Sequence, residues 1–282
     1  MKPSAFHYER PTDLQAALAL LASGEDARIL AGGQSLVPMM NYRLAQPACL
    51  IDINRVSDLD YIRDDGDVIA IGALARHGAI KSSDLIKAHL PIVAEAYDWI
   101  AHAAVRNRGT LCGNLCHADA ASEMPAIMQI LEAELVLAKV GTTRTIAATE
   151  FFVGTYETAI AEDEMLTEVR IPKPAAGTGW GFEEVAMRRG DYAWCTVVAT
   201  LEISDGNIVA PRVAIAGVND CAARLGAVEG ALTGKTPDAS LFAEVAAAAA
   251  DAATPTENAA YKRDLIRALL PRVLNDAVER AG

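Results

Sequence analysis

Two short glycine-bearing segments carry the residue types best suited to binding chemistry. The first is Ala31–Ser35, with the sequence AGGQS, and the second is Gly109–Asn114, with the sequence GTLCGN. Glycine lets a loop turn several backbone N–H groups toward one point, and such a group holds phosphate without any charged side chain. The pair predicts a pyrophosphate held between two loops, and therefore a nucleotide cofactor. The first segment is neither a Gly-x-Gly-x-x-Gly fingerprint nor a P-loop.

The residues around the second segment, Arg106–Asp119, are mostly small, polar or ionisable and lack the apolar periodicity of a core element. We therefore interpret them as a loop that forms a site. Cys112, Cys116 and His117 could suggest a metal. However, the cysteine spacing does not fit common zinc or plant-type iron–sulfur sites, and no second cysteine pair completes four ligands. A Cys–His nucleophile is disfavoured because adjacent residues rarely face each other. We predict no metal ligand and no catalytic residue.

Length, charge and cysteine content narrow the class of protein. The chain has 282 residues, enough for about two domains, and 52% of them are hydrophobic. Its net charge of −12 argues against nucleic acid, which binds through Lys and Arg. The five cysteines are scattered and odd in number, which favours a reducing compartment. No secretory leader follows Met1, and the longest apolar run, Val245–Ala253, is too short for a membrane span. We therefore expect a cytoplasmic protein.

Several elements must position the two glycine segments. A short buried strand precedes the first segment, and Ser122 with Pro125 marks a helix start after the second, because proline is tolerated in a first turn. Asp65 and Gly66 predict a hairpin. The expected helices are 12–21, 36–44, most of 82–104 with a new segment starting at Pro91, and 122–131. The expected strands are 27–30, 49–53, 59–63, 68–71, 135–139, 143–147 and 165–171.

The second part of the chain begins after a stretch rich in Pro, Gly and Ala, 172–181, which is the best candidate linker. Strand-like runs follow it, and Asp205 with Gly206 forms a hairpin turn between the last two. The pattern predicts an antiparallel sheet backed by helices. The expected strands are 182–187, 194–203 and 208–216, and the expected helices are 223–232, 241–253 and 259–280.

Taken together, these segments resemble the FAD-binding medium subunits of the molybdenum hydroxylases. That group includes carbon monoxide dehydrogenase, xanthine dehydrogenase and the bacterial N-heterocycle dehydrogenases, and the last of these look most similar. The resemblance covers essentially the whole chain. It rests on Phe6–Pro11, on Ala31–Pro38 (AGGQSLVP), on Arg106–Pro125, and on Arg189–Ala193 (RGDYA).

The resemblance implies an α+β fold. Residues 1–175 would be an FAD-binding domain of the vanillyl-alcohol-oxidase (PCMH) type, with subdomains of about 1–56 and 57–175. Residues 176–282 would be a C-terminal domain like that of the CO dehydrogenase flavoprotein, an antiparallel sheet with three helices. Both glycine segments would grip the FAD pyrophosphate, and Tyr192 would pack near the isoalloxazine ring. The residues placed at the cofactor are Ile29, Leu30, Ala31, Gly32, Gly33, Gln34, Ser35, Leu36, Ala101, Thr110, Leu111, Cys112, Gly113, Asn114, Glu123, Leu166 and Tyr192.

The resemblance also implies partners. A large subunit would carry the molybdenum cofactor and a small subunit two [2Fe-2S] clusters, in a dimer of heterotrimers, and this chain's FAD would pass electrons to an external acceptor. Two alternatives are a stand-alone FAD oxidoreductase and a flavin-less assembly subunit. The second arises because Cys112 replaces a glycine of the family pattern, and a cysteine that needed a positive φ would be strained.

Overall fold

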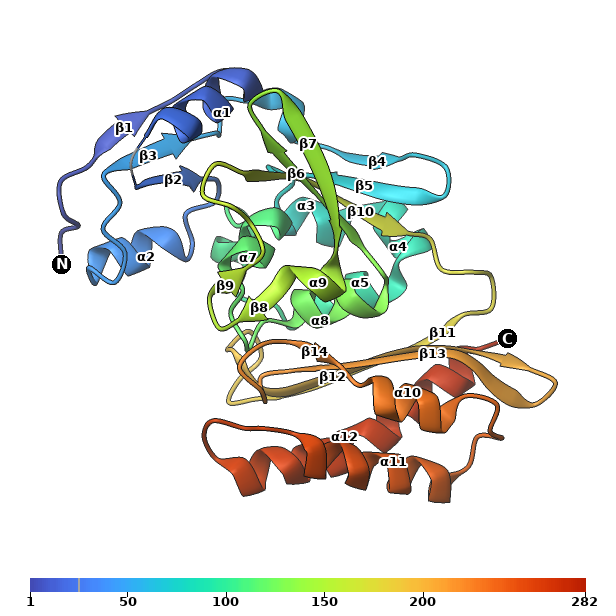
Figure 1. Ribbon diagram of the computed structural model, residues 1–282. Helices are drawn as coiled ribbons and strands as arrows, with labels where there is room; N and C mark the ends of the chain where they lie inside the picture. Colours follow the sequence, from blue (N-terminus) through green and yellow to red (C-terminus); the bar gives the residue numbers. More distant parts are fainter. Residues whose placement is uncertain (25) are drawn as a thin grey trace.

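The computed structural model describes residues 1–24 and 26–282. The N-terminal lobe is built on a parallel sheet with the strand order β1-β3-β2 (Figure 1). Asp13 begins the first helix, because its side chain accepts a hydrogen bond from the Ala16 N–H at 2.8 Å. The elements of this lobe are β1 (His7–Glu9), α1 (Leu14–Ser23), β2 (Ala27–Leu30), α2 (Leu36–Asn41) and β3 (Cys49–Asp52).

A second, antiparallel sheet follows, with the order β4-β5-β10-β6-β7. Helices gather on one side of it, below the sheet in Figure 1. The strands are β4 (Ile62–Asp64), β5 (Val68–Gly72), β6 (Glu134–Lys139), β7 (Thr142–Ala147) and β10 (Met165–Pro172), with the small pair β8 (Phe152–Gly154) and β9 (Glu157–Thr158) beside them. The helices are η1 (Ser57–Leu59), α3 (His77–Ser82), α4 (Asp84–His89), α5 (Pro91–Ala96), α6 (Ala103–Arg106), α7 (Leu111–His117), α8 (Glu123–Ile130) and α9 (Ala148–Phe151).

The C-terminal part is an antiparallel sheet, β11-β12-β13-β14, covered by helices on its outer face. The long helix α12 lies directly on the edge strand. It can do so because Gly179 and Gly181 have no side chain. A Cβ at Gly179 would lie 1.8 Å from the Ala277 carbonyl oxygen, and a Cβ at Gly181 would lie 2.1 Å from the Val273 carbonyl oxygen. The elements are β11 (Gly179–Ala186), β12 (Ala193–Ser204), β13 (Asn207–Ala216), β14 (Ala223–Arg224), α10 (Gly226–Leu232), α11 (Ala239–Ala252) and α12 (Ala259–Arg280).

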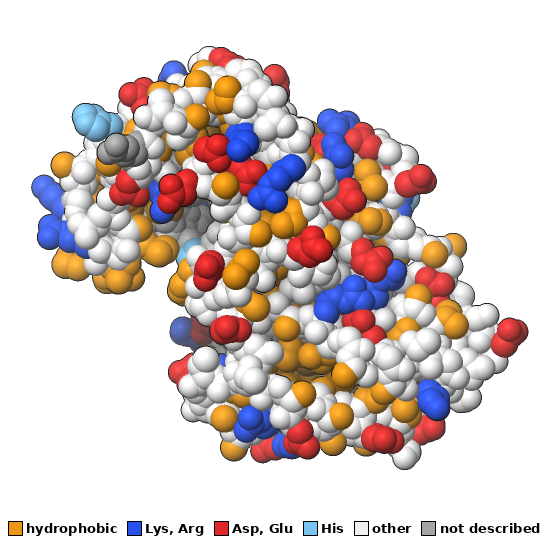
Figure 2. Space-filling model, in the orientation of Figure 1, with side chains coloured by type: hydrophobic (Ala, Val, Ile, Leu, Met, Phe, Trp, Pro, Cys, Tyr) orange, Lys and Arg blue, Asp and Glu red, His pale blue; other side chains and the backbone are white. Residues whose placement is uncertain are grey.

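Helix α8 joins the two larger sheets. Every residue of this helix is buried, because it packs against α5, α7 and α9 on one side and against β12, β13 and β14 on the other. A mainly apolar helix that is buried on every face is typical of such a central position, and its polar Gln129 donates from Nε2 to the Ala222 carbonyl at 2.8 Å. In Figure 1, α8 lies between the second sheet above and the third sheet below. Figure 2 shows that the surface is hollowed between the N-terminal lobe and the body of the molecule, on the left.

Most expected elements are confirmed, including the α+β class, both hairpins and the antiparallel C-terminal sheet with helices α10, α11 and α12. Several bounds are wrong. The helix expected over 223–232 begins only at Gly226, because Ala223 and Arg224 form β14, and the linker expected over 172–181 ends where β11 begins at Gly179. In the strand expected at 59–63, Leu59 ends the 3-10 turn Ser57–Leu59, and only the residues from Ile62 onward form a strand, which pairs with β5 over Ile62–Asp64. The mostly helical stretch expected over 82–104 is confirmed in part: α4 and α5 lie there and Pro91 begins the second segment as expected, but residues 97–102 are not helical, and Ala101 adopts a left-handed φ of 50° before α6. In the described residues, no helix is long and apolar enough to cross a membrane.

Candidate functional site

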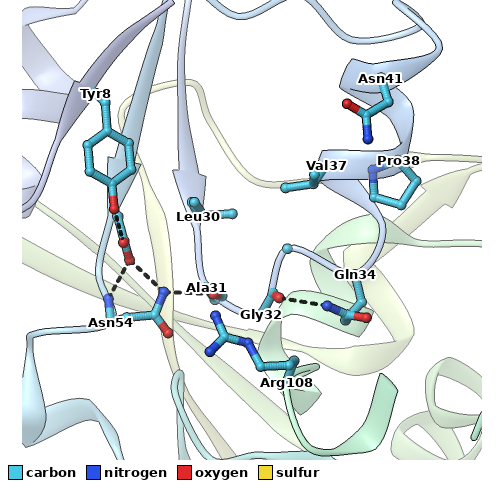
Figure 3. A pocket seen from close by; sticks show the side chains of 12 residues that line it. Tyr8, Leu30, Ala31, Gly32, Gln34, Val37, Pro38, Asn41, Asn54 and Arg108 are labelled. Carbon is cyan, nitrogen blue, oxygen red and sulfur yellow. Dashed lines mark hydrogen bonds between the residues drawn. The ribbon is translucent and has the colours of Figure 1, made fainter. Parts of the chain in front are cut away.

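The first glycine segment lies at the carboxyl edge of the parallel sheet. Strand β2 ends at Leu30 and runs directly into Ala31, while β3 ends at Asp52 and leads to Asn54. Ligands of open sheets bind outside the carboxyl ends of parallel strands. A cavity of about 490 Å³ opens at this edge (Figure 3). Its lining residues are Tyr8, Leu30, Ala31, Gly32, Gly33, Gln34, Val37, Pro38, Asn41, Asp52, Asn54 and Arg108.

The backbone of this segment presents a row of unused donors. Gly33 has a φ of 71°, in the left-handed region that glycine adopts without strain. Among the described residues, the N–H groups from Gly32 to Ser35 have no hydrogen-bond acceptor, and the first bond after them runs from the Val37 N–H to the Gly33 carbonyl at 3.1 Å. The Gln34 side chain folds back onto the Gly32 carbonyl at 3.2 Å (Figure 3). Successive free N–H groups of this kind suit an anionic ligand.

The two glycine segments are in direct backbone contact. A Cβ on Gly32 would lie 2.4 Å from the Arg108 carbonyl oxygen and 2.7 Å from the Gly109 Cα. Gly109 is itself closely packed, because a Cβ there would lie 2.8 Å from the ring of His77. Only glycine therefore allows this approach. The structure brings the first segment against the start of the second, although about 80 residues of chain separate them.

The second glycine segment is the start of a helix, which corrects the expectation of a loop over Arg106–Asp119. Thr110 is the N-cap of α7, and its Oγ1 accepts a hydrogen bond from the Gly113 N–H at 3.1 Å. Leu111 and Cys112 are buried on the inner face of the helix. Cys112 does not have a positive φ, so the strain that could have produced a flavin-less subunit does not arise at this position.

A carboxylate supports the first segment from beneath. Asn54 donates from Nδ2 to the Ala31 carbonyl at 2.8 Å and to Oδ1 of Asp52 at 2.5 Å. The Tyr8 hydroxyl donates to the same carboxylate (Figure 3). Burial tends to raise the pKa of Asp52, but the hydrogen bonds from Tyr8 and Asn54 and the charge of Arg10 lower it overall. The carboxylate therefore stays ionised at neutral pH and accepts the hydrogen bonds from Tyr8 and Asn54.

Glu123 is paired with a second buried carboxyl group. It is the first residue of α8 and is 5% exposed, while Glu184 of β11 is 4% exposed. The two carboxyl groups are close enough for their charges to interact, and Thr196 donates to Glu184 Oε2 at 3.4 Å. Burial raises the pKa of Glu123 to about 8 and also raises that of Glu184. The pair therefore retains a proton at neutral pH, and it links α8 to the C-terminal sheet.

The remaining expected residues lie in three different places. Tyr192 is 60% exposed and lines a second cavity of about 470 Å³ beside β12. Ala101 lies under the same turn, because a Cβ on Gly190 would lie 3.0 Å from the Ala101 carbonyl oxygen. Leu166 is buried in β10 opposite Leu137. The side chains of Leu111, Cys112 and Leu166 belong to the hydrophobic core, so only their backbone atoms are able to face a ligand.

Sequence reasoning missed several residues that line the first cavity: Tyr8, Asp52, Asn54 and Arg108. Tyr8 and Arg108 lie within the recognised motifs Phe6–Pro11 and Arg106–Pro125 but were not assigned to the site. A signal for Asn54 was present. A polar residue directly after a buried strand, such as Asn54 after β3, is expected at the same sheet edge as the loop after β2 if the strands are parallel.

A glycine-lined sheet edge with free N–H groups is typical of a protein that binds a nucleotide cofactor through its phosphates. Two family sequence models match the chain. One, described as the FAD binding domain in molybdopterin dehydrogenase, matches residues 4–174, and the other, the CO dehydrogenase flavoprotein C-terminal domain, matches 180–277. The chain belongs to this family of molybdopterin dehydrogenase FAD-binding proteins. The family resemblance seen in the sequence is thereby confirmed.

Individual relatives extend over most or all of the chain. The carbon monoxide dehydrogenase medium chain of Hydrogenophaga pseudoflava is 38% identical over 291 residues, covering 100% of both chains. Caffeine dehydrogenase subunit beta of Pseudomonas sp. (strain CBB1) is 40% identical over 247 residues, covering 87% of this chain and 84% of the relative. A solved structure of carbon monoxide dehydrogenase from H. pseudoflava, which lacks the Mo-pyranopterin moiety of the molybdenum cofactor, matches with a TM-score of 0.97 at 39% identity, covering 100% of each chain.

Proposed function

We propose that this chain is the FAD-carrying electron-transfer subunit of a molybdenum hydroxylase. The observation that carries the proposal is the row of free N–H groups in Gly32–Ser35, closed against the Arg108–Gly109 backbone at a sheet edge. The family match and the relatives, each named as a chain or subunit of a dehydrogenase, support it. Bound FAD would supply reversible electron transfer. The protein's contribution is to bind, orient and electronically tune it.

The residues of this chain would divide the work of holding the cofactor. The segments Ile29–Leu36 and Thr110–Asn114 would line the diphosphate. The free N–H groups of Gly32–Ser35 would donate to it, and the Arg108 side chain would add a local positive charge. This charge is useful because the whole chain carries −12. Glu123, Ala101, Leu166 and Tyr192 would contact the remainder of the cofactor, with Tyr192 near the flavin ring.

The proposal includes partners and location. Electrons would reach this chain from two [2Fe-2S] clusters on a small subunit, after oxidation of the substrate at a molybdenum cofactor on a large subunit. We further propose a dimer of heterotrimers in the cytoplasm. Within the chain, residues 1–175 would form the FAD-binding domain and 176–282 the C-terminal domain.

Purification tests the proposal against both alternatives. The chain is purified alone and together with its co-expressed neighbouring gene products, and flavin, iron and molybdenum are measured in each preparation. We expect a flavin absorption spectrum from the chain alone, and co-purification with subunits that contain iron–sulfur clusters and molybdenum. Absence of flavin would support the assembly subunit. Substrate turnover by the isolated chain would support the stand-alone oxidoreductase.

A further inference from the structure

A single arginine lies between the two glycine segments. Arg76 follows β5 as the N-cap of α3 and is half-buried. Its Nη1 donates to the Arg108 carbonyl oxygen at 2.7 Å, and its Nη2 donates to Asn54 Oδ1 at 2.5 Å. The first bond reaches the residue that immediately precedes the second glycine segment. The backbone of Arg76 forms a further bridge with Thr110, the N-cap of α7.

The second bond reaches the first glycine segment through one intermediate. The Asn54 side chain accepts from Arg76 at its oxygen and donates from its nitrogen to the Ala31 carbonyl at 2.8 Å. A continuous set of hydrogen bonds therefore runs from Ala31 through Asn54 and Arg76 to Arg108. The guanidinium suits this role because its planar, rigid array of donors is able to bond two acceptors at a fixed separation.

We propose that Arg76 is a positioning residue that sets the separation of the two glycine segments and thereby the affinity for the FAD diphosphate. The inference rests on the proposed function. Arg76 is absent from the residues lining the first cavity, so it acts through Asn54 and the Arg108 carbonyl. Loss of the guanidinium leaves both acceptors without this donor, and the separation of the segments is then free to vary.

The test is FAD titration of the full-length chain, stripped of flavin, with flavin fluorescence as the readout and thermal unfolding of the apo form beside it. Because hydrogen bonds from a charged donor are the strong ones, Arg76→Met is expected to raise the Kd for FAD about 10- to 100-fold. Arg55→Met is the matched control. It removes the same charge from an exposed neighbour whose charge also acts on Tyr8 at this cavity, and its Kd is expected to stay within about twofold of the wild type.

A double-mutant cycle separates positioning from general loss of structure. Asn54→Ala interrupts the same set of hydrogen bonds, so the Arg76→Met/Asn54→Ala chain should bind FAD no more than about twofold more weakly than the weaker single variant. The inference is overturned if the effects of the two substitutions on the FAD Kd are additive in the cycle. It is also overturned if Arg55→Met and Arg76→Met lose equal affinity for FAD, or if Arg76→Met keeps the wild-type affinity. It is also overturned if the Kd rises only in variants whose apo form has already unfolded at the titration temperature. Failure of the wild-type chain to bind FAD would instead overturn the proposed function.

Discussion

The contact between the two glycine segments makes Gly32 the most informative position to substitute. In Gly32→Ala, the new Cβ would lie 2.4 Å from the Arg108 carbonyl oxygen and 2.7 Å from the Gly109 Cα. Non-bonded heavy atoms pack best at about 3.5–4.0 Å, so the two backbones would have to separate by about 1 Å. Both neighbours are backbone atoms, which have no flexible side chain to move aside. Gly32 does not have a positive φ, so this contact is the source of the cost.

Two opposing contributions set the size of the expected loss of stability. Overpacking costs about 1–3 kcal/mol, and restricting the unfolded chain by replacing glycine with alanine offsets about 0.4–1 kcal/mol. We therefore expect Gly32→Ala to lose about 1–2 kcal/mol of unfolding free energy. Separation of the segments should also weaken FAD binding by about tenfold, since each 1.4 kcal/mol is a factor of ten in Kd.

Chemical denaturation of the apo chain and FAD titration measure the two effects. Gly230→Ala is the matched control, because a Cβ there meets no atom within 4 Å and the residue lies inside α10. It should gain up to about 1 kcal/mol from helix propensity and leave the Kd unchanged. If Gly32→Ala keeps both the stability and the FAD affinity of the wild type, the close contact of the two segments is not needed for binding, and the reasoning fails.

Three further predictions concern buried groups. Cys112→Gly, which introduces the family glycine, should lower the unfolding free energy measured by chemical denaturation by about 1 kcal/mol or more, because residue 112 lies inside α7. Tighter FAD binding by this variant would contradict the assignment of residue 112 to a helix. The protonated Glu123–Glu184 pair should make the unfolding free energy fall as the pH rises from about 5 toward the pKa of Glu123 near 8, because the folded state holds protons that the unfolded chain releases. Glu184→Gln should flatten this pH dependence of stability. An unchanged slope in the variant would show that the carboxyl pair does not cause the dependence. Lys262 is 6% exposed, and among the described residues its ammonium has only Glu257 as an ion-pair partner, at 3.8 Å. Lys262→Met should therefore be as stable as the wild type or more stable by up to about 1 kcal/mol. A clear loss of stability in thermal denaturation would refute this.

Elements defined by local pattern were predictable from the sequence, while contacts between distant segments were not. The Asp65–Gly66 hairpin and α12 follow from turn chemistry and apolar periodicity. Helix α7 was missed because its buried face contains few apolar side chains, such as Leu111 and Leu115, between polar ones. Thr110 at the N-cap was the available signal.

In the candidate site too, local features were predictable from the sequence and contacts between distant residues were not. The glycine segments were found through their composition and family pattern. Glu123 was expected at the cofactor, but its partner Glu184 comes from a strand of another sheet, and no local pattern pairs them. The bond from Arg76 to Arg108 spans 32 residues and depends on how the start of α3 meets the start of α7. Such partners become visible only when the tertiary structure is known.

The burial of α8 between two sheets has a consequence for how the chain unfolds. Removal of the C-terminal sheet would expose one side of a helix that includes Met124, Ile127 and Met128, each fully buried in the intact chain. It would also leave the Glu123 carboxyl without its partner. Helix α8, which follows the second glycine segment, is therefore stabilised by strands that lie much later in the sequence. Cofactor binding near α7 and the order of the C-terminal sheet should be thermodynamically linked, so that each stabilises the other.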